Sequence, residues 1–389
     1  MMKYFVIAGE SSGDLHARHL IDALRIRDRE ADVYYWYRPE LAYMGFVSVA
    51  MHLPEILRGM KECQNAIRGF APDRLILVDY PGFNLKIASW FHKAFIEGQD
   101  GMSFSSPKVI YYIPPKIWAW KEGRIRQIRK CVDKVLSILP FEVNWYAERY
   151  GYHVDYVGNP TLDEIDSFLR TISQDDVREW KMELALGEGR IVALLPGSRR
   201  QEIEQNLPMM LRAAESSGGD FRYVIAAAPG IPAEMYHKVI GGALGQKAMA
   251  FKDKLVLAPC QGSKSSFMLL YCSYAALVTS GTATLETAIM GVPQAVCYAM
   301  RCGKVVSWLR KLILKVPYVS LVNLIAGKEV VPELVAGDLD QKTLDETLWS
   351  LLADDEFRSL QKQGYKEMML LLGEPGAPGK AADIIIQNQ

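Results

Sequence analysis

The stretch Lys3–Asp14, KYFVIAGESSGD, places six strand-forming residues directly before a glycine-containing turn and the first residues of a helical stretch. The stretch Ile191–Arg199, IVALLPGSR, repeats this order in the second half of the chain. An apolar strand that leads through a glycine turn into a helix is typical of parallel sheets with helices on both faces. The two stretches therefore predict an α/β protein whose halves share one architecture.

The rest of the sequence continues the same alternation of apolar runs and helical periodicity. The runs that predict strands are Lys3–Ala8, Val33–Tyr37, Arg74–Val78, Lys108–Ile113, Val135–Leu139, Val154–Val157, Ile191–Leu195, Tyr223–Ala227, Leu255–Ala258, Ala275–Thr279 and Gln294–Tyr298. We expect two Rossmann-like domains that face a central cleft. Ligands of such sheets bind beyond the carboxyl ends of the strands, so two facing domains would place a binding site in this cleft.

A chain of 389 residues is long enough for two or three domains. The polar helical run Asp163–Gly189 contains no strand pattern and marks the expected connection between domains. We therefore expect a first Rossmann-like domain over residues 1–163 and a second over residues 164–340. The last part, residues 341–389, predicts C-terminal helices that pack back across the first domain.

The composition argues against several classes of protein. Forty-five basic and 45 acidic residues give a formal net charge of zero, so nucleic acid is not an expected partner. No apolar stretch reaches the roughly 18–20 residues that a membrane span needs. The six cysteines lack metal-binding spacing and indicate reduced thiols. We expect a cytoplasmic protein that is at most peripheral to a membrane.

Two turns in the first half carry candidate functional residues. In Ala8–Asp14, Ser12 and Gly13 allow the backbone of a helix N-terminus to approach a ligand. In Val78–Asn84, Asp79 lies at the carboxyl end of an apolar strand, where partial desolvation would raise its pKa toward that of a useful base. The structural alternative for both is an ordinary strand–helix turn, with Asn84 capping the second helix.

The second half contains a glycine turn that suits a phosphate group. Gly197 permits close approach of the backbone, Ser198 can donate a hydrogen bond, and Arg199 offers a charged fork. Glu202 follows one turn into the predicted helix.

A second turn of this kind follows the strand at Ala275–Thr279. Its small residues Ser280, Gly281, Thr282 and Thr284 leave free N–H groups at a helix N-terminus, which favour a pyrophosphate, and Glu286 can hold a ribose diol. Two such turns in one domain favour a nucleotide diphosphate. The alternative for each is an ordinary capped helix.

Three segments combine apolar bulk with basic charge: Met44–Lys61, Arg301–Lys315, and Lys116–Lys134, which contains Trp118 and Trp120. Met44–Lys61 ends with Arg58 and Lys61, and Arg301–Lys315 contains five basic residues and no acid. The apolar residues of Met44–Lys61 that are candidates for contact with lipid are Met44, Phe46, Val47, Leu53, Ile56 and Leu57. The pattern favours an anionic membrane surface or an acylated substrate, and a helix that faces the core is the alternative. The scattered histidines and a single late D-x-D predict no metal site.

A series of motifs extends over nearly the whole chain and resembles one family. These motifs are Ala8–Asp14 (AGESSGD), Val78–Asn84 (VDYPGFN), Tyr111–Trp120 (YYIPPKIWAW), Ile138–Glu142 (ILPFE), Tyr156–Pro160 (YVGNP), Leu194–Arg199 (LLPGSR), Ser280–Glu286 (SGTATLE) and Val319–Gly327 (VSLVNLIAG). In this order they resemble lipid-A-disaccharide synthases, the inverting glycosyltransferases of family 19.

The resemblance implies a GT-B fold and a reaction that needs no cofactor. The donor would be UDP-2,3-diacylglucosamine and the acceptor 2,3-diacylglucosamine 1-phosphate. The products would be the β(1→6)-linked disaccharide 1-phosphate and UDP. The resemblance also implies that the protein acts at the inner face of the cytoplasmic membrane, with an anionic membrane surface as a partner. It is compatible with a homodimer.

The resemblance also implies roles for particular residues. Asp79 would be the base that takes the proton of the acceptor 6-hydroxyl, with Glu10 as the second choice, and Arg199 would stabilise the leaving UDP. The UDP-binding residues would be Gly197, Ser198, Arg199, Glu202, Ser280, Gly281, Thr282, Thr284, Glu286 and Asn323. The acceptor and lipid side would use Ser12, Gly13, Asn84, Met44, Phe46, Val47, Leu53, Ile56 and Leu57.

One departure and two rival functions remain. Family members carry a longer loop after the second strand, whereas Tyr37 here runs almost directly into Leu41, which predicts an altered acceptor pocket. The rivals are another UDP-sugar enzyme of GT-B fold, such as an epimerase or a glycolipid transferase, and a non-catalytic protein that binds UDP-sugars or lipids.

Overall fold

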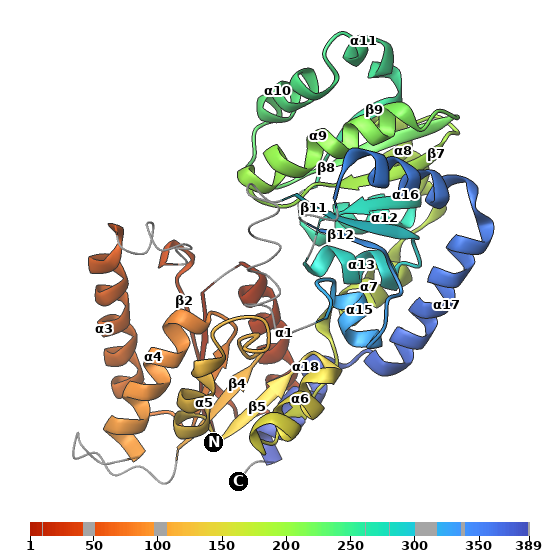
Figure 1. Cartoon of the computed structure of the whole chain (residues 1–389). Helices are drawn as coiled ribbons and strands as arrows, with labels where there is room; N and C mark the ends of the chain where they lie inside the picture. Colours follow the sequence, from red (N-terminus) through yellow and green to blue (C-terminus); the bar gives the residue numbers. More distant parts are fainter. Residues whose placement is uncertain are drawn as a thin grey trace. The chain divides into compact units, whose positions relative to one another are not determined.

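The computed structural model describes residues 1–9, 11–41, 51–96, 107–260, 262–279, 281–299, 317–335 and 339–387. The chain forms two compact units (Figure 1). Unit 1 comprises Met1–Pro160 and Glu374–Gln389, and unit 2 comprises Thr161–Gly373.

Unit 1 contains a parallel six-stranded sheet in the order β2-β1-β3-β4-β5-β6. Its strands are β1 Lys3–Ala8, β2 Asp32–Tyr37, β3 Arg74–Val78, β4 Lys108–Tyr112, β5 Lys134–Ser137 and β6 Asp155–Tyr156. The central strand β3 is buried along its whole length, since both faces of a parallel sheet are covered by helices.

Helices cover the two faces of this sheet in two groups. One face packs against α3 Leu53–Phe70, α4 Pro81–Phe91 and α5 Ile125–Cys131. The other packs against α1 Ser11–Arg27 and the C-terminal α18 Ala377–Gln387. The remaining elements of unit 1 are η1 Pro39–Leu41, the π-helix η2 His92–Ile96, η3 Glu122–Arg124 and α6 Pro140–Tyr150.

Unit 2 contains a second parallel six-stranded sheet, in the order β12-β11-β10-β7-β8-β9. Its strands are β7 Arg190–Leu195, β8 Phe221–Ala227, β9 Leu255–Pro259, β10 Ser273–Val278, β11 Gln294–Tyr298 and β12 Glu333–Val335. Its helices are α7 Pro160–Thr171, α8 Gln174–Glu183, α9 Arg200–Ser216, α10 Ala233–Leu244, α11 Lys247–Phe251, η4 Lys252–Lys254, α12 Ser263–Tyr271, α13 Thr282–Ile289, α15 Leu321–Ala326, α16 Gln341–Ala353 and α17 Asp355–Leu372.

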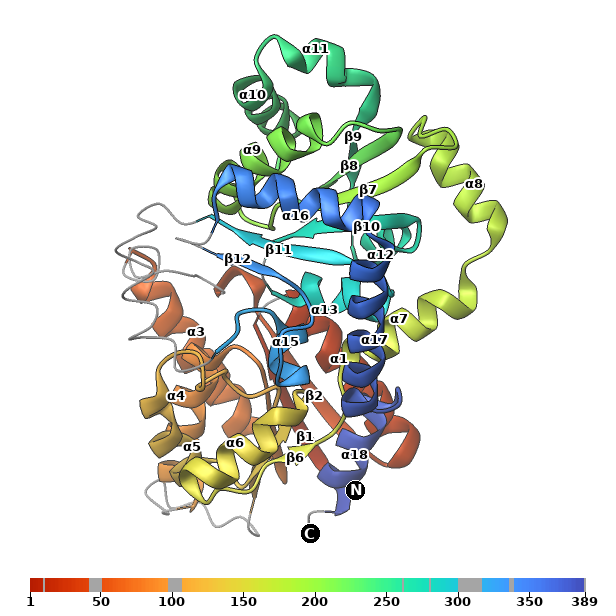
Figure 2. The ribbon, with the colours of Figure 1, turned by 45° about the vertical axis from the view of Figure 1, so that its right-hand side comes forward.

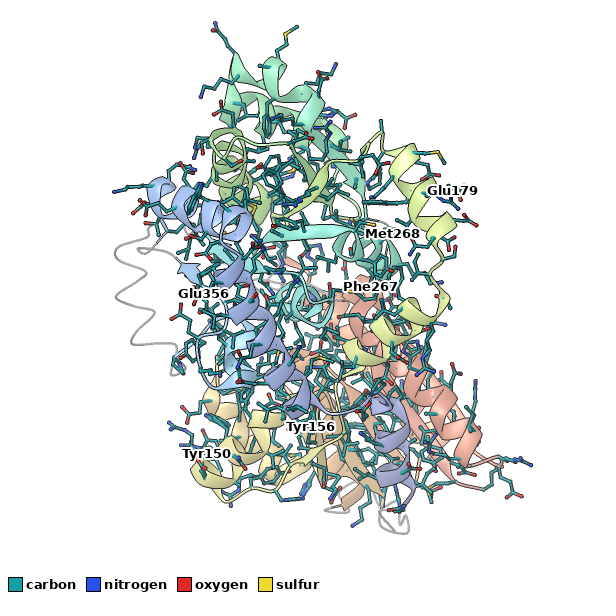
Figure 3. All side chains as sticks on the ribbon, turned by 90° about the vertical axis from the view of Figure 1, so that its right-hand side faces the viewer. Tyr150, Tyr156, Glu179, Phe267, Met268 and Glu356 are labelled. Carbon is teal, nitrogen blue, oxygen red and sulfur yellow. The ribbon has the colours of Figure 1, made fainter. Side chains whose placement is uncertain are left out.

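Figure 2 shows α9 and α16 lying along the sheet of unit 2, where their buried leucines share one core cluster with β7, β8 and β10. The opposite face packs against α12 and the segment around Leu186. Farther out, Phe267 and Met268 of α12, labelled in Figure 3, pack against Ile165 and Phe168 of α7.

The structure confirms the predicted α/β class and all eleven predicted strands, with end shifts of at most two residues. The sequence patterns missed β12, which is only three residues long. The C-terminal helices differ from the expectation, because only α18 belongs to unit 1. Helix α16 instead buries Leu344, Leu348 and Leu351 in the core of unit 2. Tyr365 of α17 donates a hydrogen bond to the carbonyl of Val292.

Candidate active site

The turn after β3 holds Asp79 in an unusual backbone conformation. Asp79 and Tyr80 both have φ of +47°, which non-glycine residues rarely adopt. The neighbouring residues hold this turn firmly: the Asn84 side-chain amide donates to the carbonyls of Val78 (3.1 Å) and Asp79 (2.7 Å), and the Tyr111 hydroxyl donates to the Asp79 carbonyl (2.7 Å). A strained turn that several hydrogen bonds maintain is typical of a functional site.

Gly9 lets the turn after β3 pack closely against the chain just before α1, and Gly13 lies beside the same turn. A Cβ atom on Gly9 would lie 2.3 Å from the ring of Tyr80. A Cβ on Gly13 would lie 3.9 Å from the Cβ of Asp79. Ser12 is exposed in the first turn of α1, near the same turn of β3. Glu10, the second candidate for the base, lies outside the described residues.

Burial raises the pKa of the Asp79 carboxyl, while the charge of Lys116 and the N–H group of Tyr80 lower it. The direction of the net shift is the one that a general base requires. Asn84, which was predicted to bind the acceptor, is fully buried. Its side-chain amide donates hydrogen bonds to the backbone of the turn. It therefore positions Asp79.

A buried carboxyl to which the sequence motifs assign no role lies in the same unit. Glu142, in the first turn of α6, is 1% exposed. It accepts hydrogen bonds from the indole N–H of Trp118 (2.7 Å) and from the hydroxyl of Ser137. Burial raises the pKa of Glu142 to about 7. The sequence signal that could have revealed Glu142 is the pair of motifs that contain Trp118 and Glu142. These two residues lie 24 positions apart in the sequence.

In unit 2 the turn after β7 is folded around Glu202. One carboxylate oxygen of Glu202 accepts the N–H groups of Ser198 (3.1 Å) and Arg199 (3.3 Å). Gly197, with φ of +113°, makes room for this carboxylate, because a Cβ there would lie 2.6 Å from it. The exposed guanidinium of Arg199 lies 3.5 Å from the other oxygen.

The turn after β10 is arranged differently. Gly281, with φ of +115°, precedes α13 and provides no side-chain cap. No acceptor among the described residues takes the N–H groups of Thr282 and Ala283. Thr284 is buried and donates its hydroxyl to the Gly281 carbonyl (2.9 Å), so it shapes the turn from inside. Ser280 lies outside the described residues.

A buried hydroxyl lies at the end of β10, and a cavity lies beyond two other strands of the same sheet. Thr279, at the end of β10, is 2% exposed, and its hydroxyl has no hydrogen-bond partner within the described part of the chain. A cavity of about 510 Å³ lies beyond the ends of β8 and β9. Its lining includes Ala228, Gly230, Ile231, Pro259 and Cys260. The ends of β7 to β10 lie at one edge of this parallel sheet, where ligands bind in such folds.

Two further predicted UDP-binding residues have distinct surroundings. Burial and the nearby Glu164 raise the pKa of Glu286 to about 7. Asn323 is fully buried and donates to Val331 O (2.9 Å) and Glu333 (3.0 Å) while it accepts from the N–H groups of Val330 and Val331. Its amide is thus used to hold the segment between α15 and β12.

On the predicted lipid side, α3 exposes apolar side chains: Leu53 is 43% and Leu57 is 53% exposed, while Ile56 is half-buried. Met44, Phe46, Val47 and the segment Arg301–Lys315 lie outside the described residues. Within the described ranges, no helix is long and apolar enough to cross a membrane, and no three metal-ligating side chains gather.

Comparisons with known proteins show the family and the fold of the chain. The family described as Lipid-A-disaccharide synthetase matches residues 4–380. The lipid-A-disaccharide synthase of Myxococcus xanthus is 33% identical, over 99% of this chain and 97% of its own length. That of Nitrosococcus oceani is also 33% identical, over 98% of this chain and 95% of its own length.

Among solved structures, the UDP-GlcNAc 2-epimerase of Neisseria meningitidis bound to UDP-GlcNAc superposes with a TM-score of 0.63. It is 12% identical and covers all of this chain, with 99% of its own length matched. That likeness confirms the GT-B fold and carries no argument for epimerase activity. The sequence relatives do not favour the rival functions, so the chain belongs to the lipid-A-disaccharide synthetase family and is a glycosyltransferase of lipid A biosynthesis.

Proposed function

We propose that this protein joins UDP-2,3-diacylglucosamine to 2,3-diacylglucosamine 1-phosphate and releases UDP. The observation that supports the proposal is that a member of this family has two suitable features, one in each unit. Unit 1 holds a constrained, half-buried carboxylate at the end of β3, and unit 2 holds an open helix N-terminus at the end of β10.

Unit 2 binds the UDP part of the donor. The N–H groups of Thr282 and Ala283 at the start of α13 hold the diphosphate, helped by the helix dipole and the Thr279 hydroxyl. The cavity beyond β8 and β9 receives the uracil. Strands β10 and β8 are two strand spacings apart, about 10 Å, which suits the length of a ribose and its diphosphate. Glu286 holds the ribose diol.

The reaction is a single displacement with inversion. Asp79 takes the proton of the acceptor 6-hydroxyl as this oxygen attacks the anomeric carbon of the donor. The bond from that carbon to the diphosphate breaks on the opposite side, and the product has the β configuration. Arg199 and the α13 N-terminus stabilise the charge that develops on UDP, so we expect activity to survive excess EDTA.

The acylated substrates place the enzyme at an anionic surface, the inner face of the cytoplasmic membrane. Exposed Leu53 and Leu57 on α3, followed by Arg58 and Lys61, suit the boundary of a bilayer. Replacing both leucines with serine should reduce flotation with anionic vesicles and leave UDP affinity unchanged. Equal flotation of the variant and the wild type would remove this part of the proposal. A homodimer stays a prediction.

Mass spectrometry of the products tests the reaction most simply. Purified protein is incubated with synthetic donor and acceptor in detergent, and we expect a tetraacyl disaccharide 1-phosphate and one UDP for each disaccharide. Conversion of the donor to an epimer, or binding of UDP without any product, would support the rival functions.

A further inference from the structure

Two motifs without a role in the proposed reaction meet inside unit 1. The indole N–H of Trp118, from YYIPPKIWAW, donates to the Glu142 carboxylate of ILPFE at 2.7 Å. The Trp118 ring also meets the ring of Phe141 edge-on, with centroids 5.2 Å apart. Glu142 is fixed from its other side by the hydroxyl of Ser137. A buried carboxyl with two donors ties the segment after β4 to the start of α6.

This anchored segment, Ile113–Trp118, presents a single lysine to solvent. Ile113 has φ of +60°, which turns the chain sharply at the end of β4. The carbonyl of Lys116 accepts the N–H groups of Ala119 (3.1 Å) and Trp120 (3.2 Å), so the segment is compact. Ile117 and Trp118 are buried, whereas Lys116 is exposed.

The segment leaves the sheet beside Asp79. Strands β3 and β4 run in register, with Val78 opposite Tyr112, and the N–H group of Asp79 donates to the Tyr112 carbonyl (3.1 Å). The charge of Lys116 lowers the pKa of Asp79 and of Glu142, against the effect of burial on each. Within the described residues, no carboxylate lies at salt-bridge distance from the Lys116 ammonium. The segment that carries Lys116 is therefore anchored beside the strand end that holds the candidate base, and the charge of Lys116 acts on that base.

We propose that Lys116 binds the 1-phosphate of the acceptor and so selects a phosphorylated sugar. Trp118 and Glu142 hold the segment that carries Lys116 in place. This inference rests on the proposed function. The 6-hydroxyl must approach Asp79. In a glucosamine ring C1 and C5 flank the ring oxygen, and C6, which carries this hydroxyl, is attached to C5, so the phosphate on C1 and the 6-hydroxyl lie toward the same end of the sugar. A phosphate on C1 is thus carried to the neighbourhood of the base, where an ammonium is a suitable partner.

The test compares two acceptors that differ only in the phosphate: 2,3-diacylglucosamine 1-phosphate and 2,3-diacylglucosamine. We expect Lys116→Met to raise KM for the phosphorylated acceptor on the order of 10- to 100-fold and to leave KM for the other unchanged. Lys116→Arg should restore most of the preference. Lys121→Met, a matched loss of charge five residues later, should change neither KM.

Trp118→Phe tests the positioning role, because it keeps the ring and removes the donor to Glu142. We expect a smaller rise in KM for the phosphorylated acceptor alone, with kcat retained. A fall in kcat with both acceptors would show a general structural role instead.

Equal effects of Lys116→Met on both acceptors would overturn the inference and show that Lys116 only balances the charge of Asp79. Calorimetric binding of each acceptor to the wild type and to Lys116→Met separates this inference from the reaction. If no disaccharide forms but Lys116→Met still weakens only the phosphorylated acceptor, the proposed function fails and the phosphate site stands. If binding of both acceptors is unchanged by Lys116→Met, the phosphate site is wrong.

Discussion

The starts of α9 and α13 share a pattern but differ in structure. Each follows a buried parallel strand and a glycine with φ above +110°. Before α9, the Glu202 carboxylate takes the loop N–H groups of Ser198 and Arg199. Before α13, the N–H groups of Thr282 and Ala283 face no acceptor in the described part of the chain. The start of α9 is therefore already occupied by the Glu202 carboxylate, whereas the start of α13 can accept the anion of a ligand.

The difference traces to the third residue of each helix. An acid at this position reaches back to the preceding N–H groups, as in a capping box, and Glu202 does so in α9. In α13 the third residue is Thr284, whose hydroxyl turns to the Gly281 carbonyl. We therefore assign different tasks to the two loops: the loop of α9 presents the Arg199 side chain, and the loop of α13 binds diphosphate through its backbone.

The largest effect should come from a residue that belongs to neither loop. Asp79→Asn should lower turnover about 10²- to 10⁴-fold, since the base is lost, and leave UDP affinity unchanged. Asn tolerates the left-handed conformation at this position, so the fold should persist. Turnover is measured with synthetic substrates and UDP affinity by calorimetry. Near-normal turnover would move the base to Glu10 or to another group.

Thr282→Asp would give α13 the anion that α9 already has. We expect a loss in UDP affinity on the order of 10- to 100-fold, because a carboxylate would repel the diphosphate in a partly desolvated site. The same change should stabilise the helix by about 0.3–1 kcal/mol, since it complements the helix dipole. Thr282→Asn is the uncharged control. Unchanged UDP binding by Thr282→Asp would place the diphosphate elsewhere.

Glu202→Gln would weaken the internal anion of α9. We expect a loss of about 1 kcal/mol in the free energy of unfolding, since a cap weakens, and a roughly tenfold fall in kcat as Arg199 becomes less well placed. Calorimetric UDP affinity should stay the same. Glu204→Gln, an exposed neighbour on α9, is the control. A large loss of UDP affinity in Glu202→Gln would assign the phosphate to the α9 loop.

The last prediction concerns the pH dependence of stability and not binding or turnover. The pKa of Glu286 is raised from its ordinary value of 4.5 to about 7 by burial and by Glu164. Between these pH values the unfolded chain loses the proton first, so the folded state loses stability as pH rises. Glu286→Gln should therefore raise Tm at pH 8 and leave it unchanged at pH 4.

An exposed matched substitution, Glu234→Gln, should show no such dependence on pH. Equal effects of Glu286→Gln at both pH values would mean that Glu286 is solvated in the folded protein.

The fold could be predicted because apolar runs between glycine and proline turns mark buried parallel strands, as in Arg74–Val78. Strand β12 escaped because Glu333–Val335 is too short to form a pattern. The position of Asp79 followed from its place at a strand end. Its strained backbone did not, because that depends on Tyr111 and Asn84, which contact it through the fold.

The sequence could not show which way a buried polar side chain points. Asn84, Thr284 and Asn323 were all predicted to contact a ligand, and in the structure each donates a hydrogen bond to the protein backbone. These hydrogen bonds hold the turns of the site, and contact of the three side chains with a ligand stays a prediction. Glu142 was overlooked for a related reason, since an acid in the first turn of a helix ordinarily faces solvent.

The structure of the protein in complex with UDP tests the contrast between the two loops most directly. We predict phosphate oxygens within hydrogen-bond distance of the N–H groups of Thr282 and Ala283, with Glu202 still bonded to the N–H groups of Ser198 and Arg199. Phosphate oxygens on the N–H groups of Ser198 and Arg199, with the Glu202 carboxylate displaced and the start of α13 empty, would contradict the account.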